Sequence, residues 1–120
     1  MREIEKVFNK MPVGKISTVK LFEGVSHYKE ALVYKYSESL AIVLEKKVYG
    51  RYAIEELYFW YPDNSIIRIL IALGVEDALL LDKEIEKQPV FYNENKVLVN
   101  IALEFWKQNS RLLEIYGKRE

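Results

Sequence analysis

The chain has 120 residues, half of them hydrophobic, and its 18 Lys and Arg residues balance its 18 Asp and Glu residues. A single domain of this size can bury a core without cross-links, and the absence of cysteine excludes a disulfide framework or a thiolate metal site. Zero net charge argues against a general phosphate-binding surface, and neither a signal peptide nor a membrane span is expected, so we expect a cytoplasmic protein.

The first half of the chain predicts a short helix, two strands and a longer helix. Residues 2–11 have the apolar spacing of an amphipathic helix, which Pro12 and Gly14 end. Residues 15–24 and 31–36 predict strands, since both are rich in β-branched and aromatic side chains. Residues 38–49 predict a helix from their apolar spacing, with a long strand as the alternative.

The centre of the chain predicts a strand, a turn and a buried helix. Residues 53–61 predict a strand that ends at Pro62, which has no N–H to donate. Residues 65–73 predict a helix, because residues 63–65 are capping types and Gly74 suits a helix end. The same isoleucine-rich run is also compatible with a strand.

The last third predicts a buried strand at 77–82, a short edge strand at 90–92 after Pro89, and a long helix from Asn93 or Asn95 to about Tyr116. The apolar stripe of this helix consists of Val97, Leu98, Ile101, Ala102, Phe105, Leu112 and Leu113. These elements predict one domain over residues 1–120 with an α/β (α+β) fold. In it, helices pack on a mixed four- to five-stranded sheet and a long helix ends the chain.

Reactive groups are few in this sequence. His27 is the only histidine, no serine lies in a nucleophile-elbow context, and no metal-ligand or phosphate-loop motif occurs. Glu55 and Glu56 are adjacent, so a strand directs them to opposite faces. We therefore expect no catalytic residue, no metal and no cofactor. A small hydrolase using carboxylates around Glu55 and Asp82 is an alternative.

Three features suggest binding. Tyr58 to Tyr61 are four consecutive aromatic residues, so two must point to each face of their strand. Lys46, Lys47 and Arg51 form a basic cluster that is either a solvated helix end or a small phosphate contact. Leu103 and Trp106, three positions apart on the last helix, predict a second apolar strip that suits a protein partner.

The segment EELYFWYPDNSIIRILIALGV, which begins at Glu55, resembles the central segment of the small kinase-binding subunit of the KEOPS complex (the TPRKB-like family). The matching features are Glu55, the strand that follows it, the turn at Pro62 and Asn64, and a helix that begins near Ile66. Gly74 and Val75 then follow with the family's spacing. The order of the predicted flanking strands and helices also fits the family.

The resemblance implies a non-catalytic subunit. Members of the family bind the small atypical kinase/ATPase of the complex, which makes threonylcarbamoyl-adenosine in tRNA, and some also bind the CCA end of tRNA. The residues that the resemblance and the basic cluster assign to tRNA are Lys46, Lys47, Arg51, Tyr61 and Asn64. The residues assigned to the kinase interface are Leu103, Trp106 and Ser110.

A second hypothesis uses the same apolar helix for self-association. On this reading the chain is a small homodimeric interaction protein of archaeal or viral type. A thermophilic, archaeal source fits the abundance of charged residues and the lack of cysteine.

Overall fold

The computed structural model describes residues 8–22, 27–49, 52–75 and 78–116. Six strands form one sheet in the order β1-β2-β3-β4-β5-β6, and every neighbouring pair is antiparallel. The strands are β1 (Ile16–Phe22), β2 (His27–Ser37), β3 (Leu40–Tyr49), β4 (Tyr52–Trp60), β5 (Ile66–Val75) and β6 (Ala78–Asp82). After them come the 3₁₀ turn η1 (Ile85–Lys87) and the helices α2 (Pro89–Glu94), α3 (Lys96–Asn109) and α4 (Arg111–Tyr116).

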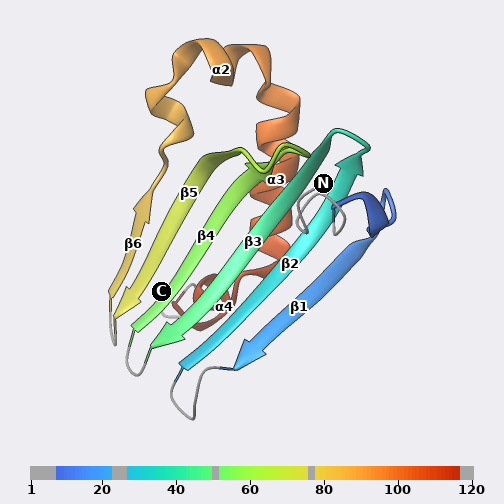
Figure 1. Cartoon of the computed structure of the whole chain (residues 1–120). Helices are drawn as coiled ribbons and strands as arrows, with labels where there is room; N and C mark the ends of the chain where they lie inside the picture. The colour runs from blue at the N-terminus through green and yellow to red at the C-terminus, as the bar shows by residue number, and fades with distance from the viewer. Residues whose placement is uncertain (1–7, 23–26, 50–51, 76–77, 117–120) are drawn as a thin grey trace.

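Helices α3 and α4 lie behind the central strands, while β1 and β6 form the two lateral edges of the sheet (Figure 1). We call the face of the sheet that meets α3 and α4 the inner face and the opposite face the outer face. The α+β class with helices packed on a sheet is therefore confirmed. The prediction of a mixed sheet is wrong, because each strand returns beside its predecessor through a short connection, which requires antiparallel pairing.

Every second side chain along the central strands points to the inner face and contributes to the inner core. Leu44 of β3, Leu57 of β4 and Leu70 of β5 lie in one cross-strand row, and all three are fully buried. Val99 and Trp106 of α3 belong to the same apolar cluster. At about 1.5–3 kcal/mol for each large side chain removed from water, this inner layer is the main source of stability.

A smaller cluster occupies the outer face. Phe8, which is fully buried, meets Trp60 edge to face with ring centroids 5.1 Å apart. Lys35 is only 1 % exposed, and its ammonium donates to the Phe8 carbonyl at 2.9 Å and to Glu38 at 3.3 Å. The N-terminal segment is therefore anchored on the outer face by one buried cation and one aromatic pair.

The aromatic run divides between the two faces as predicted. Tyr58 and Trp60 belong to the outer cluster, whereas Phe59 and Tyr61 belong to the inner one. Phe59 and Trp60 are buried, so their rings are covered by protein and do not form a free stacking platform.

Two predicted helices are strands. Residues 40–49 form β3 and residues 66–75 form β5, so the strand alternative holds in both cases. Between β4 and β5, Asp63, Asn64 and Ser65 form a tight turn rather than a helix cap. The backbone N–H of Asn64 donates to the Tyr61 carbonyl at 2.9 Å, and Asn64 has a φ of 71°. An uninterrupted apolar run shows neither the spacing of a helix nor the alternation of a strand. Its β-branched side chains, which are common in strands, then favour a strand.

The helical predictions at the two ends also change. The edge strand predicted at 90–92 is wrong, because Pro89 starts α2, a position where its missing N–H costs nothing. The long last helix is broken at Ser110, which is extended with ψ 124°. Of the N-terminal helix predicted over 2–11, residues 8–10 are helical and residues 2–7 lie outside the described part of the chain.

Candidate functional site

The carboxylate of Glu55 lies between the inner face of β4 and the break in the last helix. Glu55 is 2 % exposed. Its Oε1 accepts hydrogen bonds from Trp106 Nε1 at 3.1 Å and from the Ser110 hydroxyl. Its Oε2 accepts from the backbone N–H groups of Arg111 at 2.8 Å and Leu112 at 3.4 Å. A single side chain thus binds both sides of the α3–α4 break.

These four donors explain how an acidic side chain is tolerated in the core. Buried carboxylates are costly unless hydrogen bonds or opposite charges compensate them. Two of the donors are the first N–H groups of α4, which have no partner within the helix. Ser110 serves the same helix end, because its hydroxyl accepts from Leu113 N–H at 3.0 Å. The arrangement is that of a structural clasp, and we call these residues the Glu55 clasp: Glu55, Trp106, Ser110, Arg111 and Leu112.

The register of the sheet separates the two carboxylates of the hydrolase alternative. Glu55 is aligned with Ala72 and Leu81 across β4, β5 and β6, whereas Asp82 belongs to the next row with Ile71 and Glu56. Adjacent rows face opposite sides of a sheet. The backbone register therefore places Glu55 and Asp82 in adjacent rows and not in one row.

A cavity of about 440 Å³ opens beside the Glu55 clasp. Its lining residues are Glu30, Lys46, Lys47, Val48, Ala53, Ile54, Glu55, Arg111 and Leu112. Lys46 is half-buried there, and no ion pair joins it to another residue of the described chain. The lining of the cavity thus combines four apolar residues with three basic and two acidic ones.

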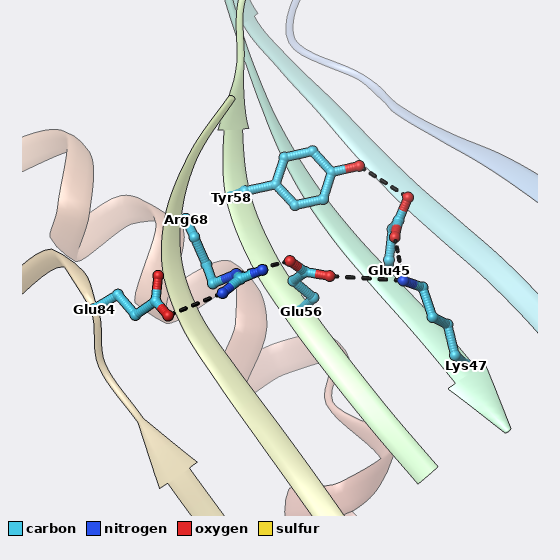
Figure 2. A network of polar contacts seen from close by, with 6 residues as sticks. All are labelled: Glu45, Lys47, Glu56, Tyr58, Arg68 and Glu84. Carbon is cyan, nitrogen blue, oxygen red and sulfur yellow. Dashed lines mark hydrogen bonds and ion pairs between the residues drawn. The ribbon is translucent and has the colours of Figure 1, made fainter. Parts of the chain in front are cut away.

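On the outer face, a chain of polar contacts crosses three strands (Figure 2). Arg68 bridges two carboxylates, with its Nε 2.8 Å from Glu56 and its Nη1 2.9 Å from Glu84. Lys47 lies 3.2 Å from Glu45 and 3.7 Å from Glu56. These ion pairs neutralise charges that the strands hold close together, and the hydrogen bonds that Arg68 donates to Glu56 and Glu84 raise the pKa of Arg68.

Tyr58 lies at one end of this chain of contacts. Because of its environment, we expect the free energy of unfolding to fall at alkaline pH. Its hydroxyl donates to Glu45 at 3.0 Å, and burial, together with the charge of Glu45, raises its pKa above the usual value of about 10. Above pH 10 only the unfolded chain ionises this tyrosine, so stability falls as pH rises, by at most about 1.4 kcal/mol per pH unit.

Urea unfolding at a series of alkaline pH values would measure this slope. Tyr58→Phe is expected to flatten it, whereas Tyr52→Phe, at a tyrosine that is 53 % exposed, is expected to leave it unchanged. Equal slopes for the unmodified chain and Tyr58→Phe would contradict the prediction.

The residues predicted to contact tRNA are not brought together. Lys46 and Lys47 both line the cavity beside Glu55, but the ammonium of Lys47 forms ion pairs in the outer network. Tyr61 and Asn64 lie in the β4–β5 turn, six or more residues along the sheet from the row of Lys46, or about 20 Å at 3.3 Å per residue. Arg51 lies outside the described residues. Alternation along β3 explains why neighbouring lysines in the sequence do not form one patch.

The residues predicted for the kinase interface lie largely inside the protein. Trp106 is 3 % exposed and Ser110 6 %, and both bind Glu55. Leu103 is half-buried against the inner core. The prediction of an outward strip containing Trp106 is therefore wrong, because the indole packs under the helix and finds its acceptor on β4.

The exposed apolar surface of α3 lies elsewhere, beside the edge strand β1. A groove of about 510 Å³ runs between them, lined by Ile16, Tyr34, Val97, Asn100, Ile101, Glu104, Phe105 and Gln108. Val97 is 70 % exposed and Ile16 52 %, and Tyr34 and Phe105 form the floor with ring centroids 6.2 Å apart. We call it the α3–β1 groove. The apolar spacing predicts Val97 in the core stripe, but in the structure Val97 is exposed and lines this groove.

Neither a metal site nor a membrane span emerges from the described residues. Within them, no group of three His, Asp or Glu side chains is arranged to hold a metal ion. None of their helices combines the length and the hydropathy that a bilayer crossing requires. Comparison of the chain with protein-family models, with curated proteins and with solved structures finds no match.

Proposed function

We propose that this chain is a non-catalytic interaction protein that contributes a binding surface to a cytoplasmic protein assembly. The observation that carries the proposal is the α3–β1 groove, where Val97 and Ile16 expose 70 % and 52 % of their surface around an aromatic floor. Single exposed apolar side chains are normal, but several around one hollow are typical of interaction sites. The Glu55 clasp supports the non-catalytic part of the proposal, because its carboxylate is occupied by four donors.

The small atypical kinase/ATPase of the KEOPS complex is the first partner to test. The support for it is the residue pattern from Glu55 to Val75, including the turn at Pro62 and Asn64. The order of elements no longer supports it, since residues 66–75 form a strand where the family pattern has a helix. Contact with the CCA end of tRNA stays a prediction of the same resemblance, and the scattered positions of Lys46 and Asn64 do not favour it.

Co-elution of the purified chain with that kinase in size-exclusion chromatography would test the kinase as partner. Val97→Asp is expected to weaken the complex at least tenfold, because it places a charge in the apolar groove, a loss of about 1.4 kcal/mol or more. Val90→Asp is the matched control, because Val90 is also 70 % exposed but lies on α2, away from the groove.

Three outcomes separate the possibilities. Loss of co-elution with Val97→Asp alone would support the kinase as occupant of the groove. Equal weakening by both variants would contradict the groove as the contact surface. No complex with the unmodified chain would remove the KEOPS kinase as the partner.

A further inference from the structure

The edge strand β1 is open to further pairing. Within the described residues it pairs only with β2, in a continuous register from Ile16 to Phe22 without a bulge. Its sequence, ISTVKLF, contains one charge and no proline. Natural edge strands are normally protected by prolines, bulges, several charges or a covering segment. Over seven residues, about 23 Å at 3.3 Å per residue, β1 presents a row of backbone groups that pairs with no second strand in the described part of the chain.

We propose that a second copy of this chain occupies the edge, by antiparallel pairing of β1 with the β1 strand of its partner. The inference rests on the proposed function, because it keeps the α3–β1 groove as the interaction surface, and it places a second copy there in place of the kinase. It yields a closed two-fold dimer whose sheet runs continuously through both protomers.

The sequence of β1 is compatible with pairing to itself. An antiparallel pair centred on Val19 places Val19 opposite its own copy, Thr18 opposite Lys20, and Ile16 opposite Phe22. The single charge thus meets a neutral hydroxyl residue instead of a like charge, which would be destabilising. The other edge is less suitable, since β6 pairs over only five residues and runs directly into Asp82 and Lys83.

The same symmetry brings the two grooves together. An antiparallel two-fold pair has its axis perpendicular to the sheet, so the helix layers of both protomers lie on the same side. The α3–β1 groove of each protomer then borders that of its partner across the new strand pair. Val97 and Ile16, the exposed apolar residues of the groove, lie next to this junction. Strand pairing alone gives a narrow contact, whereas specific dimers bury roughly 800 Å² on each partner, so the inference requires the apolar groove to take part in the interface.

A pairing of β1 with β6 of another copy would have a different result. Such a contact uses two different surfaces and leaves a free edge on each copy, so it propagates into a filament. The mass of the particle in solution therefore distinguishes the two modes of pairing.

Light scattering coupled to size-exclusion chromatography, on the full chain over a range of concentrations, tests the inference. The expected mass is twice the 14.2 kDa of one chain. Ile16→Lys and Val97→Asp are each expected to raise the dissociation constant of the dimer at least tenfold and shift the peak toward the monomer. Circular dichroism and thermal unfolding verify that each variant is folded.

Two controls match these variants in exposure. Ile66 is 51 % exposed against 52 % for Ile16, and Val90 equals Val97 at 70 %. Ile66→Lys and Val90→Asp are therefore expected to remain dimeric. Equal effects within either matched pair would contradict the inference, as would particles that grow with concentration beyond a dimer.

The two proposals fail in different ways. A chain that is monomeric at all concentrations overturns the second-copy inference. If that monomer still binds the kinase through Val97, the proposed function stands. If the monomer binds no kinase either, neither a second copy nor the kinase binds the groove, and the proposed function fails together with the inference.

Discussion

Replacing Glu55 by alanine is expected to lower the free energy of unfolding by about 3–5 kcal/mol, because removal of one member of a buried charged network leaves its partners unsatisfied. The partners are the indole N–H of Trp106, the Ser110 hydroxyl and two backbone N–H groups at the start of α4. Glu55→Gln retains one carbonyl oxygen as an acceptor, so a smaller loss of about 1.5–3 kcal/mol is expected. Urea unfolding followed by circular dichroism measures both values.

Glu104→Ala is the control for this substitution. Glu104 is exposed on α3, and its contact with Lys107 spans 3.6 Å on the surface, so its removal is expected to cost less than about 0.5 kcal/mol. A loss below about 1 kcal/mol for Glu55→Ala would show that the carboxylate does not hold the α3–α4 break to the sheet.

Replacing Trp106 by alanine is expected to cost about 3–5 kcal/mol, the usual range for a large aromatic side chain in a core. Trp106→Phe keeps most of the packing but removes the N–H that Glu55 accepts, so a loss of about 1.5–3 kcal/mol is expected. Thermal and urea unfolding measure both, with Val97→Ala as an exposed control on the same helix.

The burial of Trp106 makes its substitution unsuitable as a test of a binding surface. A substitution such as Trp106→Asp would abolish binding to every partner, because it disrupts the inner core and not because Trp106 contacts the partner. If Trp106→Ala were as stable as the unmodified chain, the burial of the indole would be contradicted. Trp106 would then again be a candidate for the kinase interface.

The strands with turn residues on both sides were predictable from the sequence. Residues 15–24, 31–36 and 53–61 correspond to β1, β2 and β4, because glycine, proline or serine limits an otherwise β-branched and aromatic run. Residues 77–82 correspond to β6, for which the signal was a short run of leucines. The apolar spacing of residues 38–49 predicts a helix, and so do the capping residues before 65–73 and Gly74 after them, but both segments are strands. On a strand covered on both faces, such a run fits helical spacing and strand alternation equally well.

The Glu55 clasp could not be predicted from the residues near Glu55 in the sequence. Glu55 meets donors that lie 51 to 57 residues later in the chain, and no nearby residue signals that distance. Only the break of the last helix had a local signal, since Ser110 is a preferred capping residue, but the continuous apolar stripe on either side concealed it. Similarly, Val97 fits the apolar stripe of the predicted helix, yet it is exposed beside β1 in the α3–β1 groove.

The long sequence separation of the clasp has a consequence for the order in which this protein folds. Every strand pairs with its immediate neighbour in the chain, so the sheet can form hairpin by hairpin as the polypeptide leaves the ribosome. Glu55 emerges early and remains hydrated until residues 106–112 are available. We therefore expect the inner face, with Leu57 and Phe59, to stay open to solvent and to chaperones until the last helix docks. Because α3 and α4 follow all six strands in the chain, the core is expected to close only after the sheet has formed, when Glu55 meets its donors.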